Sequence, residues 1–172
     1  MKISRRHCLA CAALPWLTAC TRESDKGRQG PQEVNPATAC DLDGMLLADY
    51  AGPKAQLHYA DDPKPVFLCD TVEMVSLLLK PEQVRPLKAA YVQDMGKADW
   101  DRPVGHWIDA KTAFFVHGSK RHGSMGPTLA TFAEAAAAEG FVKAWGGKIL
   151  PFSQLTADLA DLSGGALHDS RM

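Results

Sequence analysis

The sequence lacks the motifs by which the common classes of active site are recognised. Its 172 residues contain no Gly-x-Ser-x-Gly, no His-Glu-x-x-His, no phosphate-cradling glycine pattern and, beyond residue 19, no Cys-x-x-Cys. A nucleophilic Cys40 with a histidine base is formally conceivable, but nothing in the sequence positions the two groups. We therefore predict that the protein is not an enzyme.

Long basic runs are also absent, as are apolar runs long enough to form a permanent membrane span. The apolar residues 8–19 number about a dozen, fewer than a spanning helix needs, and they follow the basic residues Lys2, Arg5 and Arg6. This order predicts a cleaved export signal over residues 1–19. Its removal takes away three basic residues and no acidic residue, so the formal net charge changes from −1 to −4. That charge argues against nucleic acid as a partner.

The residues Leu17, Thr18, Ala19 and Cys20 resemble the lipobox at which bacterial lipoproteins are processed. Cys20 is then the lipid-modified first residue of the mature chain, and each buried CH₂ of its acyl chains stabilises membrane attachment by about 0.8 kcal/mol. Residues 20–36 are almost entirely charged, polar, Gly or Pro, which predicts a flexible tether. The alternative is a plain signal peptide cut near Ala19. We expect a periplasmic protein, anchored by lipid to a bacterial membrane.

The rest of the chain is typical of an α+β fold made of two small ββαβ units in tandem. The first unit is predicted over residues 37–96. Its strands follow from alternating or continuous apolar residues, and its helix from a capping-box pattern at Asp70 and Glu73. These elements are expected at residues 54–59, 65–69, 70–80 and 86–95.

The second unit is predicted over residues 97–160, followed by a flexible tail over residues 161–172. Its helix is expected to begin at a second capping box, formed by Thr131 and Glu134, and to continue through an alanine-rich run. Its strands are expected at residues 106–110, 112–118 and 148–152. Trp100 should form a fixed corner between the units, because a tryptophan is usually buried.

Cys40 and Met45 are the strongest candidates for metal ligands. A thiolate and a thioether are soft donors, and Cu(I) is the first-row ion that prefers this pair. Zinc takes four ligands drawn from cysteine, histidine and carboxylate. Calcium needs more oxygen donors than Asp41 and Asp43 supply. The residue types therefore indicate Cu(I).

The spacing of these two sulfur ligands requires a turn. Positions five apart share a face in neither a helix nor a strand. The turn dipeptide Asp43-Gly44, with a positive φ at Gly44, can fold Met45 back toward Cys40. The alternative is an ordinary turn in which Met45 starts the core and Cys40 is incidental.

Further ligands have to come from outside this turn. His58, on the first predicted strand, is the first choice for a third ligand, and His122 and Met125 in a glycine-rich loop are further candidates. An isolated histidine is, however, more often a surface or hydrogen-bonded residue than a ligand. Cys69 could form a disulfide with Cys40, bind the metal or simply be buried.

Segments along the chain resemble the NosL family of bacterial accessory lipoproteins. They run in consistent order from Cys40 to Asp169: CDLDGM, GPKAQLHY, PVFLCDTVEM, YVQDMGKADW, GHWIDAKTAFFVHGSKRHGSMGPTLATF and GGKILPF. The Cys-x-x-x-Gly-Met motif of the family falls here on Cys40, Gly44 and Met45. Relatives often carry a second cysteine or a histidine inside this motif. The present chain has two aspartates there instead, which makes a ligand from elsewhere more necessary.

The resemblance implies a fold of two ββαβ units and a periplasmic, membrane-anchored protein that binds one Cu(I). Such a protein is expected to deliver copper for the maturation of the copper centres of nitrous oxide reductase, beside an ABC-type transporter complex. We expect it to act as a monomer. The alternative function is a non-metal scaffolding lipoprotein stabilised by a disulfide between Cys40 and Cys69.

Overall fold

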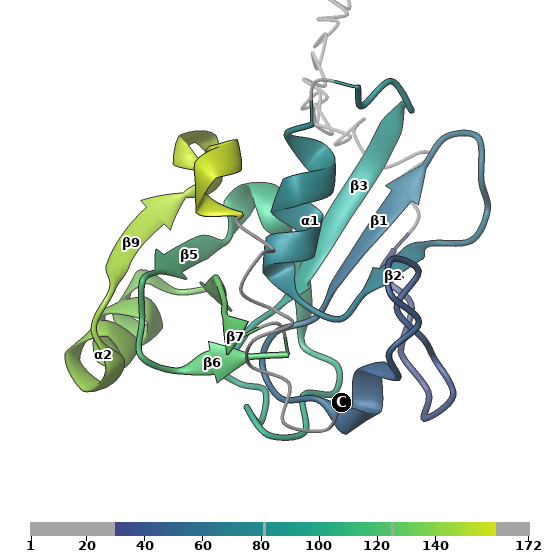
Figure 1. Ribbon diagram of the computed structural model, residues 1–172. Coiled ribbons are helices and arrows are strands. Elements are labelled where there is room, and N and C mark those ends of the chain that lie inside the picture. Colours follow the sequence, from purple (N-terminus) through teal and green to yellow (C-terminus); the bar gives the residue numbers. More distant parts are fainter. Residues whose placement is uncertain (1–29, 81, 125, 161–172) are drawn as a thin grey trace, which may run out of the picture.

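The first part of the molecule is a ββαβ unit in which one helix covers an antiparallel sheet (Figure 1). The computed structural model describes residues 30–80, 82–124 and 126–160. The sheet has the strand order β2-β1-β3-β4. Its elements are β1 (Ala55–Tyr59), β2 (Val66–Leu68), α1 (Thr71–Leu78), β3 (Leu87–Gln93) and β4 (Trp107–Asp109). The strands and helix predicted for the first unit are confirmed.

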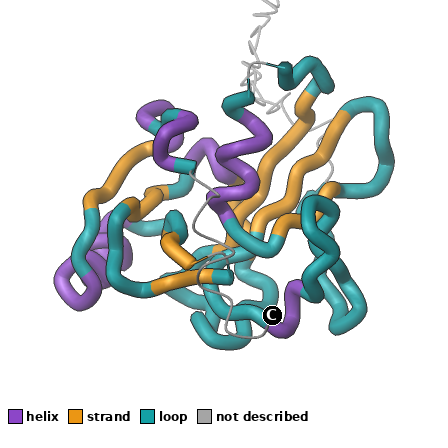
Figure 2. Tube along the Cα trace, viewed as in Figure 1, coloured by secondary structure: helices purple, strands orange, loops and turns teal. Residues whose placement is uncertain are grey.

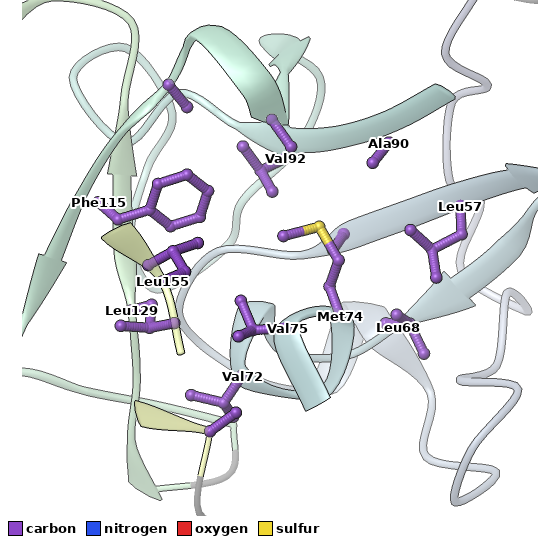
Figure 3. Close-up of a cluster of buried hydrophobic side chains, with 14 of the residues drawn as sticks. Leu57, Leu68, Val72, Met74, Val75, Ala90, Val92, Phe115, Leu129 and Leu155 are labelled. Carbon is purple, nitrogen blue, oxygen red and sulfur yellow. The ribbon is translucent and has the colours of Figure 1, made fainter. Parts of the chain in front are cut away.

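Helix α1 begins where predicted because Asp70 and Glu73 form a capping box. The Asp70 carboxylate accepts a hydrogen bond from the Val72 amide at 3.1 Å, and the Glu73 carboxylate accepts one from the Asp70 amide at 3.2 Å. Two otherwise unpaired donors of the first turn are thereby satisfied. Met74 and Val75 point from the helix into the core (Figure 3). The cap also holds the Glu73 side chain beside the start of the helix.

The second ββαβ unit repeats the topology of the first. Its strand order, β8-β5-β9, corresponds to β2-β1-β3, and all its pairs are antiparallel. Its elements are β5 (Phe114–His117), β8 (Ala130–Phe132), α2 (Ala135–Trp145) and β9 (Lys148–Pro151). Between β5 and β8 the chain forms a hairpin of β6 (His122–Gly123) and β7 (Gly126–Pro127). Single-turn 3-10 helices lie at Leu47–Asp49, Ala110–Thr112, Phe152–Gln154 and Ala157–Leu159.

Two expectations for the second unit are corrected. The strand expected at residues 106–110 belongs to the first sheet, since β4 pairs with β3. Thr131 does not cap the second helix but lies in β8, where its hydroxyl donates to the Gln93 carbonyl at 2.6 Å. The segment forms a strand instead of a helix start because pairing with β5 buries all three residues of β8. Helix α2 therefore begins only at Ala135.

Among the described residues, the larger of two buried clusters joins the two units. Leu57, Met74 and Val92 of the first unit lie in the same buried cluster as Phe115 of the second (Figure 3). A smaller cluster surrounds Trp100, which is 6% exposed. The expectation of a fixed corner at Trp100 is confirmed, because its ring stacks on Phe141 and its indole N–H donates to the His122 carbonyl at 3.1 Å.

The segment before β1 is attached to the first sheet. The Gln32 amide donates to the Gln56 side chain at 2.9 Å, and that side chain donates back to the Gln32 carbonyl at 3.0 Å. From here to β1 the chain is loop apart from the 3-10 turn at Leu47–Asp49 (Figure 2). Gln32, which lies within the predicted tether 20–36, is thus hydrogen-bonded to β1. The predicted signal peptide, Cys20 and the tail 161–172 lie outside the described residues.

Among the helices of the described residues, none has both the length and the apolar character needed to cross a membrane.

Candidate metal site

Residues 39–46 form a tight turn, here called the site hairpin. The Cys40 amide donates to the Met45 carbonyl at 2.8 Å, and the Gly44 amide donates to the Cys40 carbonyl at 2.9 Å. Gly44 has a φ of +80°, a conformation that favours glycine. The predicted turn is confirmed, and it brings the backbone of Met45 opposite that of Cys40. The half-buried Met45 side chain packs against the core cluster that contains Cys40 and Cys69.

The edge of the first sheet fixes the position of the site hairpin. The Asp41 amide donates to the Phe67 carbonyl at 2.8 Å, and the Phe67 amide donates to the Asp41 carboxylate at 2.6 Å. Phe67 lies in β2, which ends one residue before Cys69. In Figure 1 the dark-blue segment that carries the hairpin accordingly runs beside β2. This pairing sets Cys40 close to Cys69 and to the start of α1.

Four side chains converge at this point and form what we call the thiol–carboxylate cluster: Cys40, Asp43, Cys69 and Glu73. One ligand atom from each lies within 4.8 Å of the others. The Cys40 thiol lies 3.4 and 3.6 Å from the two Glu73 oxygens, and the Cys69 thiol donates to Asp43 Oδ2 at 3.6 Å. Both cysteines are free thiols and are buried, as is Glu73, whereas Asp43 is exposed. The cluster is therefore a buried pair of sulfurs that reaches solvent at Asp43.

The segment of the β6–β7 hairpin contacts Cys69 and Asp70 beside the cluster. The Ser124 hydroxyl donates to the Cys69 carbonyl, and the Thr128 hydroxyl donates to Asp70 Oδ1 at 2.6 Å. Gly123 packs so closely on this network that a Cβ there would overlap the Asp70 carboxylate and lie 2.9 Å from the Thr128 Cβ. Asp70 thus serves both as the cap of α1 and as the anchor of the second hairpin.

The electrostatics of the cluster favour bound protons while no metal is present. Burial raises the pKa of Glu73, and the nearby charge of Asp43 raises it further. The hydrogen bond with Cys40 and burial raise the pKa of the Cys69 thiol. A metal ion would therefore displace protons when it binds, since thiols must ionise to act as ligands.

The predicted third ligand, His58, lies away from the cluster. Its Nε2 is 2.9 Å from Gln56 Oε1, and its ring packs edge-on against Tyr91 at 5.4 Å between ring centres. Strand alternation explains this position, because Leu57 packs into the core that α1 covers and the neighbouring residue must face the other side of the sheet. His122 is exposed and, like every other histidine of the described ranges, is not part of the cluster. Met125 lies outside these ranges.

Comparison with known proteins gives the family. The family model of NosL matches residues 31–160. The chain belongs to the NosL family. The copper-binding lipoprotein NosL of Achromobacter cycloclastes is 38% identical over 160 residues, which cover 91% of this chain and 82% of the relative. The protein of the same name from Stutzerimonas stutzeri is 34% identical over 159 residues, 89% of this chain and 83% of the relative.

A solved NosL structure confirms the fold. The crystal structure of the copper chaperone NosL from Shewanella denitrificans has a TM-score of 0.72 to this chain at 36% identity. The match covers 76% of this chain and 98% of that one. These relatives are named as copper-binding or copper-chaperone proteins and not as enzymes.

The NosL motif accounts for only part of the cluster. It supplies Cys40, while Cys69 and Glu73 come from the end of β2 and the first turn of α1. From the sequence, Glu73 is predicted only as part of the capping box, and Cys69 has three alternative roles. The sequence pattern that indicates their proximity is a cysteine directly before a helix N-cap with a glutamate four residues later. This pattern places both side chains at one helix start.

Replacing Glu73 with glutamine is expected to stabilise the metal-free protein at neutral pH. Because burial raises the pKa of Glu73 above the unfolded value of 4.5, its ionisation opposes folding. This penalty is absent below the unfolded pKa and grows as pH rises through the folded pKa. Glutamine also retains an acceptor for the Asp70 amide. Urea unfolding of wild type and Glu73→Gln from about pH 4 to about pH 8, with a chelator present, measures the effect.

The matched control is Glu139→Gln on the exposed side of α2. It should show no pH-dependent gain in the free energy of unfolding. A Glu73→Gln protein that is equally stable as wild type at every pH, or less stable at neutral pH, would contradict the prediction.

Proposed function

We propose that this protein is a periplasmic, lipid-anchored chaperone that binds one Cu(I) and delivers it for assembly of the copper centres of nitrous oxide reductase. It works beside an ABC-type maturation complex. The observation that carries the proposal is the approach of the Cys40 and Cys69 sulfurs to within 4.8 Å inside a buried cluster. The names of the relatives, copper-binding lipoprotein and copper chaperone, support the same ion.

The donors of the site suit Cu(I) chemically. Cys40 and Cys69 supply thiols, and Met45 packs against the same part of the core. Thiolate and thioether donors select Cu(I), which is stable with two or three soft ligands. We propose Cys40, Met45 and Cys69 as the ligands, with Cys69 in the place that sequence reasoning gave to His58. Bound copper is the cargo of the protein and supplies no chemistry to it.

The position of the site is suited to transfer. The site hairpin lies at the surface, and its Leu42 and Asp43 are exposed although the two sulfurs are buried. A partner that approaches the hairpin can offer its own soft ligands and take the ion by stepwise exchange. The lipid anchor at Cys20 would keep this exchange at the membrane.

Copper binding is tested by competition with a Cu(I)-chelating dye. The reduced wild type should withdraw one equivalent of Cu(I). Met45→Leu should weaken binding by about 10- to 100-fold, the range measured for residues that support a metal site. Met95→Leu is the matched control, because Met95 packs in the smaller core cluster away from the site. Failure of the wild type to withdraw copper, or equal behaviour of the two variants, would argue against the site.

Delivery is tested with copper-free nitrous oxide reductase. The loaded protein should restore the absorption of the reductase copper centres faster than the same amount of the Cu(I)–dye complex. Equal rates would indicate that the protein only stores copper.

The scaffolding alternative with a Cys40–Cys69 disulfide is separated by a thiol count. The structure holds both residues as free thiols, although their sulfurs are close. Protein purified anaerobically from the periplasm should show two free thiols when it is counted before any copper is added. A count of zero would favour the disulfide-bonded scaffold.

A further inference from the structure

Lys54 is a buried cation to which the proposed function assigns no role. Its side chain is the largest of those with no solvent exposure, and its ammonium group donates to the Ala51 carbonyl at 3.0 Å. Its backbone is held on both sides by Gln93, through bonds of 3.0 and 3.2 Å. Burial of an ammonium group is costly unless anions compensate it. The described residues provide no ion pair with Lys54, so the compensation has to come from charges slightly further away.

The largest of those charges is Asp70, which adjoins Cys69, and the others belong to the thiol–carboxylate cluster. The last pair of the β1–β2 ladder is Ala55 with Leu68, and Lys54 and Cys69 are the residues directly beyond this pair on the two chains. The groups whose charges favour the protonated lysine are Asp70, Cys69, Glu73 and Cys40. Burial nevertheless lowers the pKa of Lys54 to about 8, which leaves the side chain largely protonated at neutral pH. A positive charge therefore faces the site from inside the protein.

The effect of this charge on copper binding depends on the number of thiolate ligands. When Cu(I) replaces the protons of two thiols, two S–H bonds break, two Cu–S bonds form and two protons leave. The site then loses one net positive charge, and a neighbouring cation stabilises the product. When Cu(I) binds one thiolate and a thioether, one proton leaves for each Cu(I) that enters. The net charge is then unchanged and the cation has little effect.

We propose that Lys54 is a positioning residue that supplies the internal counter-charge for a Cu(I) bis-thiolate formed by Cys40 and Cys69. The inference rests on the proposed copper-binding function and adds to its two thiolates a charge partner. The negative charge of a Cu(I) bis-thiolate would add to that of Asp70 in stabilising the buried ammonium group.

A double-mutant cycle tests the proposal on the reduced full chain. Cu(I) affinity is measured by dye competition for wild type, Lys54→Met, Cys69→Ser and the double variant. Lys54→Met should weaken binding about tenfold in the wild-type background and less than about threefold in the Cys69→Ser background. Lys54→Arg keeps the charge and should retain most of the affinity. Thermal unfolding of each variant identifies a loss of fold.

A proton count provides a second measurement that does not depend on the folding of the Lys54 variants. Calorimetry in two buffers with different ionisation enthalpies should give about two protons released per Cu(I) for wild type and about one for Cys69→Ser. One proton in both proteins would overturn the inference, as would an equal effect of Lys54→Met in both backgrounds. These results leave the copper function intact if wild type still binds Cu(I). If wild type binds no Cu(I), both proposals fail.

Discussion

Replacing Cys40 with serine is expected to lower the affinity for Cu(I) by more than about 100-fold, because changing a residue that merely supports a metal site already costs about 10- to 100-fold. Serine exchanges a soft sulfur for a hard oxygen that Cu(I) does not prefer. The hydroxyl can still accept the Leu42 amide, which donates to the Cys40 sulfur at 3.3 Å, so the site hairpin should persist. Dye competition measures the affinity, and far-ultraviolet circular dichroism checks the fold.

The matched control for this substitution is Ala39→Ser. Ala39 is exposed, lies next to Cys40 and bridges Leu46 within the same hairpin. The Ala39→Ser variant should bind Cu(I) with the same affinity as the wild type. If Cys40→Ser and Ala39→Ser compete equally well for copper, the ion is not held by Cys40.

Replacing Gly123 with alanine is expected to destabilise the protein by about 2–4 kcal/mol, the sum of overpacking and of lost buried hydrogen bonds. The new Cβ would overlap the Asp70 carboxylate and meet the Thr128 Cβ at 2.9 Å. Gly52 closes the other side, since its own Cβ position lies 2.6 Å from the Gly123 Cα. The β6–β7 hairpin then has to move away from α1. Thermal unfolding should show a midpoint lower by roughly 10 °C.

Gly140→Ala is the control for this substitution. Gly140 lies inside α2, and a Cβ there would meet no atom within 4 Å. Alanine should therefore stabilise the helix by about 0.5–1 kcal/mol, since glycine is the poorer helix former. Equal unfolding midpoints for the two variants would contradict the packing argument for Gly123.

The first unit was predictable because each of its elements carries a strong local signal. The capping box at Asp70 and Glu73 marks the start of α1, and both of its hydrogen bonds are present. The same capping pattern at Thr131 and Glu134 gave a wrong prediction of a helix start, because Thr131 lies in β8. Pairing of that segment with β5 joins residues about fifteen positions apart, which no local pattern encodes.

The candidate site was predictable only in its hairpin. The turn at Gly44 is a local feature, so the approach of the Met45 backbone to Cys40 could be inferred from the six residues 40–45. The proximity of Cys69 and Glu73 to Cys40 depends on the hydrogen bonds between that hairpin and β2, which are long-range contacts. His58 was misplaced for a different reason, because the face on which a strand residue lies depends on which neighbours enter the core.

The pairing of Asp41 with Phe67 also protects the sheet from self-association. β2 is an edge strand, and an unpaired edge is a template for strands of other chains. The site hairpin occupies this edge through two hydrogen bonds to the Phe67 backbone, one from the Asp41 amide and one to the Asp41 carboxylate. Asp41 and Asp43 are both exposed beside it. The lipid anchor proposed at Cys20 would concentrate copies in the plane of a membrane, where they would meet one another often. The site hairpin thus also hinders neighbouring copies from adding strand to strand into aggregates.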